Sequence, residues 1–130
     1  MLMKVTFPVF IFEGQDLSVF LTAKDLSDYI EWYDVEDGIF RGFDFTGRHL
    51  GLLVDENKDV QCKILEGENG NDELMRRVRT LLRDSTPPIG ISDNENATKA
   101  VAVGLFVERS RTAPTVIQWL KSCLGQCRRR

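Results

Sequence analysis

The chain is poor in the residues that disulfide-stabilised and membrane-spanning proteins depend on. Its three cysteines form an odd set without metal-like spacing, which favours reduced thiols in a cytoplasm. Its longest apolar runs, FPVFIF and AVAVGLFV, fall far below the ~20 residues needed to cross a bilayer. We therefore expect a cytoplasmic chain that does not span a membrane and has no disulfide framework.

Catalytic motifs are also scarce. His49 is the only histidine, and no G-x-S-x-G, P-loop or dinucleotide-binding fingerprint is present. The acidic segment DVEDG, residues 34–38, lacks the ligand offsets of a calcium loop. We expect His49 to be a structural or surface histidine, and we expect no catalytic residue, no cofactor and no metal site. A hydrolase that uses acidic residues is a third-ranked alternative.

The composition is that of one folded domain. The chain has 130 residues, of which 42% are hydrophobic and 28% charged. A lysine and an apolar stretch open the chain as in a signal peptide. However, Pro8 interrupts the stretch and no small-residue cleavage site follows, so a first strand is the expectation. We predict a single domain over residues 1–130 with a basic tail at 128–130.

Alternating apolar residues in the first half predict an antiparallel sheet. The segments KVTFPVFIFE and LSVFL favour two strands, with Pro8 tolerable at an edge or near a bulge. The runs 39–45 and 48–54 flank Thr46-Gly47, where glycine supplies the positive φ of a hairpin turn. A further strand is expected over 59–66. The three last runs form a predicted meander.

Helical spacing predicts a helix over about residues 22–33. Thr22 and Asp25 stand three residues apart, as in a capping box. The apolar positions that keep the helical period are Leu26, Tyr29, Ile30 and Tyr33. Acidic residues are expected on the solvent side of this helix.

The pattern changes to a helical period after about residue 70. A helix over 71–84, with Asn71 as its cap, has one apolar stripe and arginines on its other faces. The segment 97–107 suits a buried helix or strand, and its alanines and Asn96 favour helix. A last helix is predicted over 114–127. The class predicted is therefore α+β, with an antiparallel sheet packed against three to four helices.

The charge is unevenly distributed along the chain. Residues 1–75 contain 16 Asp and Glu against 6 Lys and Arg, whereas residues 76–130 contain 4 against 11. The first half thus has a net charge of −10 and the second of +7. The arginines of 71–84 are mixed with an acidic helix start and lack an accompanying aromatic stripe. Solvated charge therefore explains them better than nucleic-acid binding.

The first half resembles a known class of proteins. The segments VFIFE, DLSDYIEWYDVEDG and FDFTGRHLGL, within about residues 5–55, are similar to small immunity proteins that bacteria encode beside polymorphic or contact-dependent inhibition toxins. The resemblance implies an inhibitor that binds one cognate toxin domain and covers its active site. Many such toxin domains are nucleases with basic clefts, which an acidic surface would complement.

The resemblance and the charge place the interface at the acidic turn. Trp and Tyr beside it are candidate interface anchors. The predicted partner-binding residues are Asp28, Glu31, Trp32, Tyr33, Asp34, Glu36 and Asp37. The expected partner is a toxin protein, with no direct nucleic-acid contact. The alternative is a small regulatory module that binds a ligand or nucleic acid through the basic C-terminal half. In FDFTGR, residues 43–48, we expect a structural turn in which Asp44 accepts amide hydrogen bonds.

Overall fold

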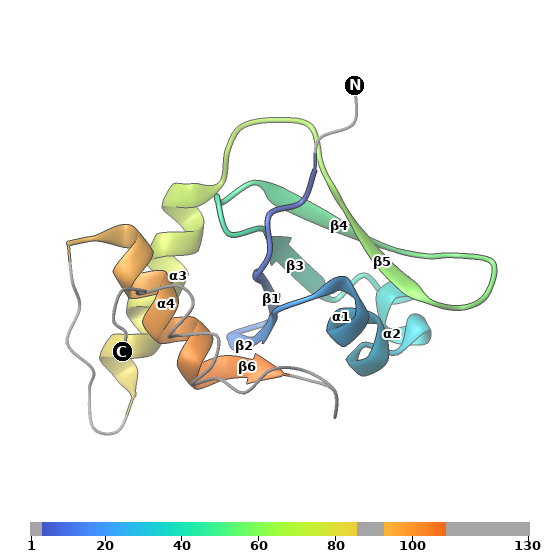
Figure 1. Ribbon diagram of the computed structural model, residues 1–130, viewed down its shortest axis with the longest axis horizontal. Helices are drawn as coiled ribbons and strands as arrows, with labels where there is room; N and C mark the ends of the chain where they lie inside the picture. The colour runs from blue at the N-terminus through green and yellow to red at the C-terminus, as the bar shows by residue number, and fades with distance from the viewer. Residues whose placement is uncertain (1–3, 86–92, 109–130) are drawn as a thin grey trace, which may run out of the picture.

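A six-stranded sheet lies between two layers of helices in the computed structural model, which describes residues 4–85 and 93–108 (Figure 1). The strand order is β5-β4-β3-β1-β2-β6, antiparallel except that the short β6 pairs in parallel with β2. The elements are β1 (Val9–Glu13), β2 (Asp16–Phe20), α1 (Ala23–Tyr29), α2 (Trp32–Glu36), β3 (Phe40–Phe43), β4 (His49–Val54), β5 (Val60–Ile64), α3 (Asn71–Asp84), α4 (Glu95–Phe106) and β6 (Val107–Glu108). The predicted α+β class and the β3–β4–β5 meander are confirmed.

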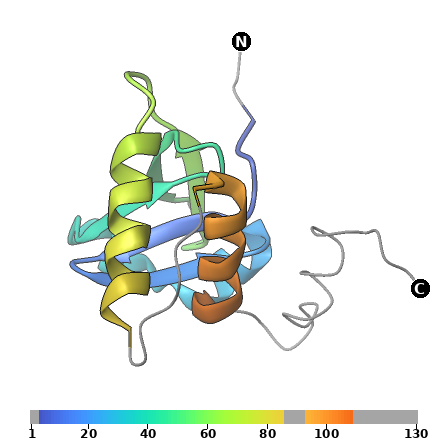
Figure 2. The same cartoon turned by 90° about the vertical axis from the view of Figure 1, so that its left-hand side faces the viewer.

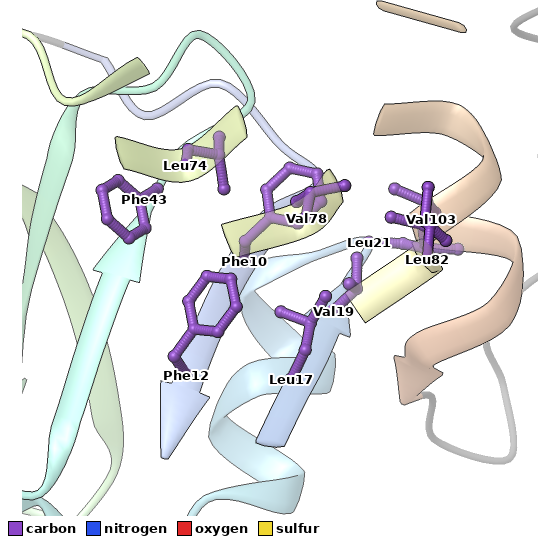
Figure 3. Close-up of a cluster of buried hydrophobic side chains, with 11 residues drawn as sticks. Phe10, Phe12, Leu17, Val19, Leu21, Phe43, Leu74, Val78, Leu82 and Val103 are labelled. Atoms are coloured by element: carbon purple, nitrogen blue, oxygen red, sulfur yellow. The ribbon is translucent and has the colours of Figure 1, made fainter. Parts of the chain in front are cut away.

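The central strand β1 is buried on both faces, which explains its continuous apolar run. Neighbouring side chains of a strand point to opposite faces. Phe10 and Phe12 therefore pack with α3 and α4, and Val9 and Ile11 pack on the side of α1. Figure 3 shows Phe10 and Phe12 among the buried side chains that the sheet shares with α3 and α4. Pro8 precedes β1, so it lies neither on an edge strand nor inside the sheet.

The predicted helix over 22–33 is two helices, so that prediction is wrong in its extent. Thr22 caps α1 as expected, since its Oγ1 accepts from the Asp25 amide at 3.1 Å. Ile30 and Glu31 then adopt extended backbone conformations, and α2 begins at Trp32. Ile30 is buried beside α1 although it has left the helical conformation. Helical spacing is a weak preference that tertiary packing can override.

The second helical layer consists of α3 and α4, which lie side by side on one face of the sheet (Figure 2). The span of α3 matches the predicted 71–84, but Gly70 occupies the cap position instead of Asn71. The helical interpretation of 97–107 is correct, although Asn94 caps α4 in place of Asn96. The predicted helix over 114–127 lies outside the described residues.

A buried polar cluster joins the β3–β4 turn to both of these helices. The Asp44 carboxylate is fully buried and accepts from the amides of Thr6, Thr46 and Arg48 at 3.2, 3.0 and 3.0 Å. The Thr46 hydroxyl donates to it at 2.6 Å. The buried Lys99 donates to the Phe45 carbonyl, and burial lowers the pKa of its ammonium. The structural role predicted for FDFTGR is confirmed.

Asn71 and Gly47 complete the junction between the turn and α3. The Asn71 side chain accepts from Lys99 at 2.7 Å and donates to Glu95 at 3.0 Å. Gly47 has a φ of 93°, and a Cβ there would lie 2.4 Å from the Asn71 Cα. Glycine is therefore required at this turn for both conformation and space.

An ion-pair network fastens the start of α3 to β3 and gives a pH prediction. The Arg41 guanidinium donates to both Glu73 oxygens at 2.6 Å, and Arg77 adds a bond at 2.9 Å. These bonds lower the pKa of Glu73 from 4.5 to about 2, and the bonds from Arg41 have the largest effect. The stabilisation is therefore complete above about pH 4.5 and is lost as the pH falls towards 2.

Urea unfolding should show Glu73→Gln to be less stable than the parent near neutral pH. A stability difference between the two that is unchanged at low pH would contradict this linkage.

Candidate partner-binding groove

An open groove of about 620 Å³ lies beside the β1–β2 hairpin. Its walls come from the hairpin, the end of α1 and the start of α2, with Phe40 of β3 between them. Leu81 of α3 and Phe106 of α4 extend it to the other side of the sheet. The groove thus has an apolar floor to which elements distant in sequence contribute.

Carboxylates line this groove. Glu13 and Asp16 come from the hairpin, and Glu31 and Asp34 come from the start of α2. No lysine or arginine is among the described residues that line the groove. None of the four carboxylates forms an ion pair within residues 4–85 and 93–108. The groove therefore has charge of one sign, which we call the acidic groove.

The turn of the hairpin brings two of these carboxylates together. Glu13 and Asp16 are direct partners across the β1–β2 ladder, and Gly14 between them has a φ of 63°. Glu13 is also paired with Phe40 on the other side. Like charges directly opposite each other in a sheet are destabilising. This pair is therefore a local cost to the free energy of folding that a cation from outside would relieve.

Tyr29 supplies an exposed aromatic ring at the edge of the acidic groove. Its side chain remains 53% exposed, although its ring lies 5.6 Å from that of the buried Phe20. Tyr33, at 51% exposure, does not line the groove. The prediction that both tyrosines keep the apolar stripe of one helix is wrong, because the helix breaks at Ile30.

The structure places the predicted interface residues in three different settings. Glu31 and Asp34 line the acidic groove. Trp32 packs against the buried cluster on the α1 side of the sheet, which includes Val9 and Ile11. The Lys58 ammonium lies 4.2 Å from the centroid of the Trp32 ring. Tyr33 packs edge-on against Trp32. The remaining acidic residues are exposed outside the groove, and they are Asp28, Glu36 and Asp37.

Sequence reasoning missed three of the groove residues. Glu13, Asp16 and Tyr29 line the groove but were not predicted as interface residues. The available signal was the Gly-Gln turn after an apolar strand, which places the flanking acidic residues opposite each other. Asp28 is paired with Lys24 at 2.6 Å, and this pair was visible as an i,i+4 spacing.

The candidates for chemistry lie elsewhere in the fold. The His49 ring is half-buried, with its centroid 5.0 Å from that of Phe43, and a Cβ at Gly70 would lie 2.5 Å from its Nε2. Within the described ranges, no three His, Cys, Asp or Glu side chains are grouped as metal ligands would be. Nor does any described helix have the length and apolarity to cross a membrane.

Comparisons with known proteins place the chain in no family. No family model and no solved structure matches it. Phosphoribosylformylglycinamidine synthase subunit PurL of Lacticaseibacillus casei is 27% identical over 128 residues. That match covers 91% of this chain and 17% of PurL, so the chain spans about a sixth of the enzyme's length.

Proposed function

We propose that this chain is a cytoplasmic immunity protein of a bacterial toxin system, an inhibitor and not an enzyme. The observation that carries the proposal is the acidic groove, where four carboxylates without ion-pair partners among the described residues surround an apolar floor. The partner is a toxin domain with a basic cleft, for which a nuclease is the best fit. The protein neutralises it by occupying that cleft.

Electrostatics supports a basic partner. The first 75 residues have a net charge of −10, and a field of one sign speeds association with an oppositely charged protein. Carboxylates spaced along a groove can also occupy the positions at which a nuclease binds phosphates. A lysine or arginine between Glu13 and Asp16 would offset the repulsion across the hairpin.

Co-expression with the product of the adjacent upstream gene tests the proposal. We expect a complex that survives purification, and loss of the toxin's activity when the two proteins are mixed. A neighbouring gene product that neither binds nor loses activity would contradict the proposed function, as would hydrolase activity in this chain alone. The likeness to PurL covers too little of that enzyme to support a different proposal.

Tyr29 is the aromatic anchor that the groove geometry favours. The sequence indicated Trp32 and Tyr33, but neither lines the groove. We expect Tyr29→Ala to weaken toxin binding by about 2 kcal/mol, mostly as an approximately 30-fold faster dissociation. Surface plasmon resonance measures this rate. Tyr33→Ala is the matched control, because Tyr33 is equally exposed outside the groove. If only Tyr33→Ala dissociated faster, the aromatic anchor would be Tyr33 of α2 and the assignment of Tyr29 would be wrong.

A further inference from the structure

A row of arginines lies along α3, a helix that contributes only Leu81 to the described lining of the acidic groove. Arg76, Arg79 and Arg83 are three and four residues apart, a spacing that places them on one face of the helix. They line a shallow hollow of about 370 Å³ with Met75 and Thr80. We call these three residues the arginine ridge. Figure 1 shows α3 on the opposite side of the sheet from α1 and α2.

The ion pairs of α3 among the described residues do not include the arginine ridge. Glu73 at the start of the helix is bonded to Arg41 and Arg77. No carboxylate forms an ion pair with the ridge in the part of the chain that the structure describes. From the sequence we expected these arginines to be solvated, partly because acidic residues stand at the start of the same helix. In the structure Glu73, one of those acidic residues, is paired with Arg41 and Arg77 and with none of the ridge arginines.

The linear arrangement suits a chain of phosphates better than a single one. The seven steps from Arg76 to Arg83 advance about 10 Å along the helix axis. Three guanidinium groups spread over that length can bind successive phosphates of one strand, whereas a single phosphate could not reach all three. Guanidinium groups bind phosphate oxygens in bidentate geometry. Asp72 and Glu95 also line the hollow and would repel phosphates placed close to them.

We propose that the arginine ridge binds the phosphate backbone of a nucleic acid without reading its bases. No aromatic residue is among the described residues that line the hollow, so base stacking contributes nothing there. The ligand class is therefore set by phosphate spacing and charge. This inference is independent of the proposed function, because it uses the arginine face of α3, whose charge is opposite to that of the acidic groove.

Fluorescence anisotropy of a labelled oligouridylate, titrated with the full chain at several salt concentrations, tests the inference. The ridge variant is Arg76→Ala, Arg79→Ala and Arg83→Ala together. The matched control removes three exposed cations elsewhere, as Lys4→Ala, Lys58→Asn and Lys63→Ala. Asparagine is used at Lys58 because that residue has a φ of 68°, which asparagine tolerates. A third variant replaces Arg128, Arg129 and Arg130 by alanine.

Three phosphate contacts predict an approximately 20-fold loss of affinity between about 50 and 200 mM salt. The ridge variant should lose this salt-dependent part of the affinity. The slope of its plot of log affinity against log salt should therefore be smaller in magnitude by about 2 than that of the parent. The control and the tail variant should keep the slope of the parent. Equal binding by the ridge variant would overturn the inference, as would an equal loss in the control or a loss confined to the tail variant.

The identity of the anion is tested with two further probes. Oligothymidylate should bind as well as oligouridylate, because the ridge presents guanidinium groups to phosphates alone. A strong preference for one of them would contradict binding through the backbone. Polyglutamate should compete weakly, since its carboxylates lack the charge density of a phosphate chain. Equal competition would show a surface for acidic polypeptides and overturn the assignment to nucleic acid.

Discussion

Reversal of Glu13, Asp16 and Glu31 to lysine is expected to slow association with the toxin domain by about 10- to 1,000-fold at low salt. Two causes act together. The favourable long-range field is lost, and three cations then line the groove that a basic surface must enter. Association should also become much less sensitive to salt, because ions screen the attraction that the variant no longer has. Stopped-flow mixing over a salt series measures both effects.

A second triple variant separates the groove from general charge. Asp28→Lys, Glu36→Lys and Asp37→Lys make the same change of charge at exposed sites outside the groove. They should slow association less and leave dissociation nearly unchanged, as is usual for charges at the rim of an interface. Both variants should fold normally, since exposed carboxylates contribute about 0–1 kcal/mol each. If the two variants changed the association and dissociation rates equally, the groove would not be the surface that binds the toxin domain.

Asp44→Ala is expected to lower the free energy of unfolding by about 3–5 kcal/mol, a large part of the 5–15 kcal/mol typical of a domain. The carboxylate is fully buried and accepts from three backbone amides and one hydroxyl. Alanine would leave those donors without acceptors. Urea denaturation followed by circular dichroism measures the change.

Two milder variants show whether the amides are the cause. Asp44→Asn keeps one acceptor oxygen, so it should lose less stability than alanine does. Thr46→Ala removes a single hydroxyl donor from the same carboxylate and should cost about 1 kcal/mol. A stability of Asp44→Ala close to that of the parent would show that water replaces the carboxylate in the turn, contrary to this account.

Local patterns predicted the strands, their hairpins and α3 well. The alternation around Thr46-Gly47 and the stripe of α3 depend on neighbouring residues only, so they could be recognised without a partner element. Cap positions were predicted less accurately. Asn71 is engaged by Lys99 and Glu95, which lie on another helix and could not be placed in advance.

The candidate site was harder to predict than the fold, for a physical reason. The acidic groove lies where the chain leaves the helical conformation at Ile30 and Glu31, so that the end of α1 and the start of α2 meet the hairpin. This meeting joins elements that are distant in sequence, and local patterns do not place such elements relative to one another. The acidic character of the region was visible in the sequence, whereas the contribution of Glu13 and Asp16 was not.

Hydrogen exchange of the complex with the product of the adjacent upstream gene tests the central claim most directly. We expect slower amide exchange in two segments when the partner binds, the hairpin turn at 13–17 and the α1–α2 junction at 29–35. Exchange in the first two turns of α3, which do not line the groove, should remain as in the free protein. Protection of the α3 face around Arg76 and Arg83, with the hairpin turn and the junction unchanged, would contradict the assignment of the acidic groove as the toxin-binding surface.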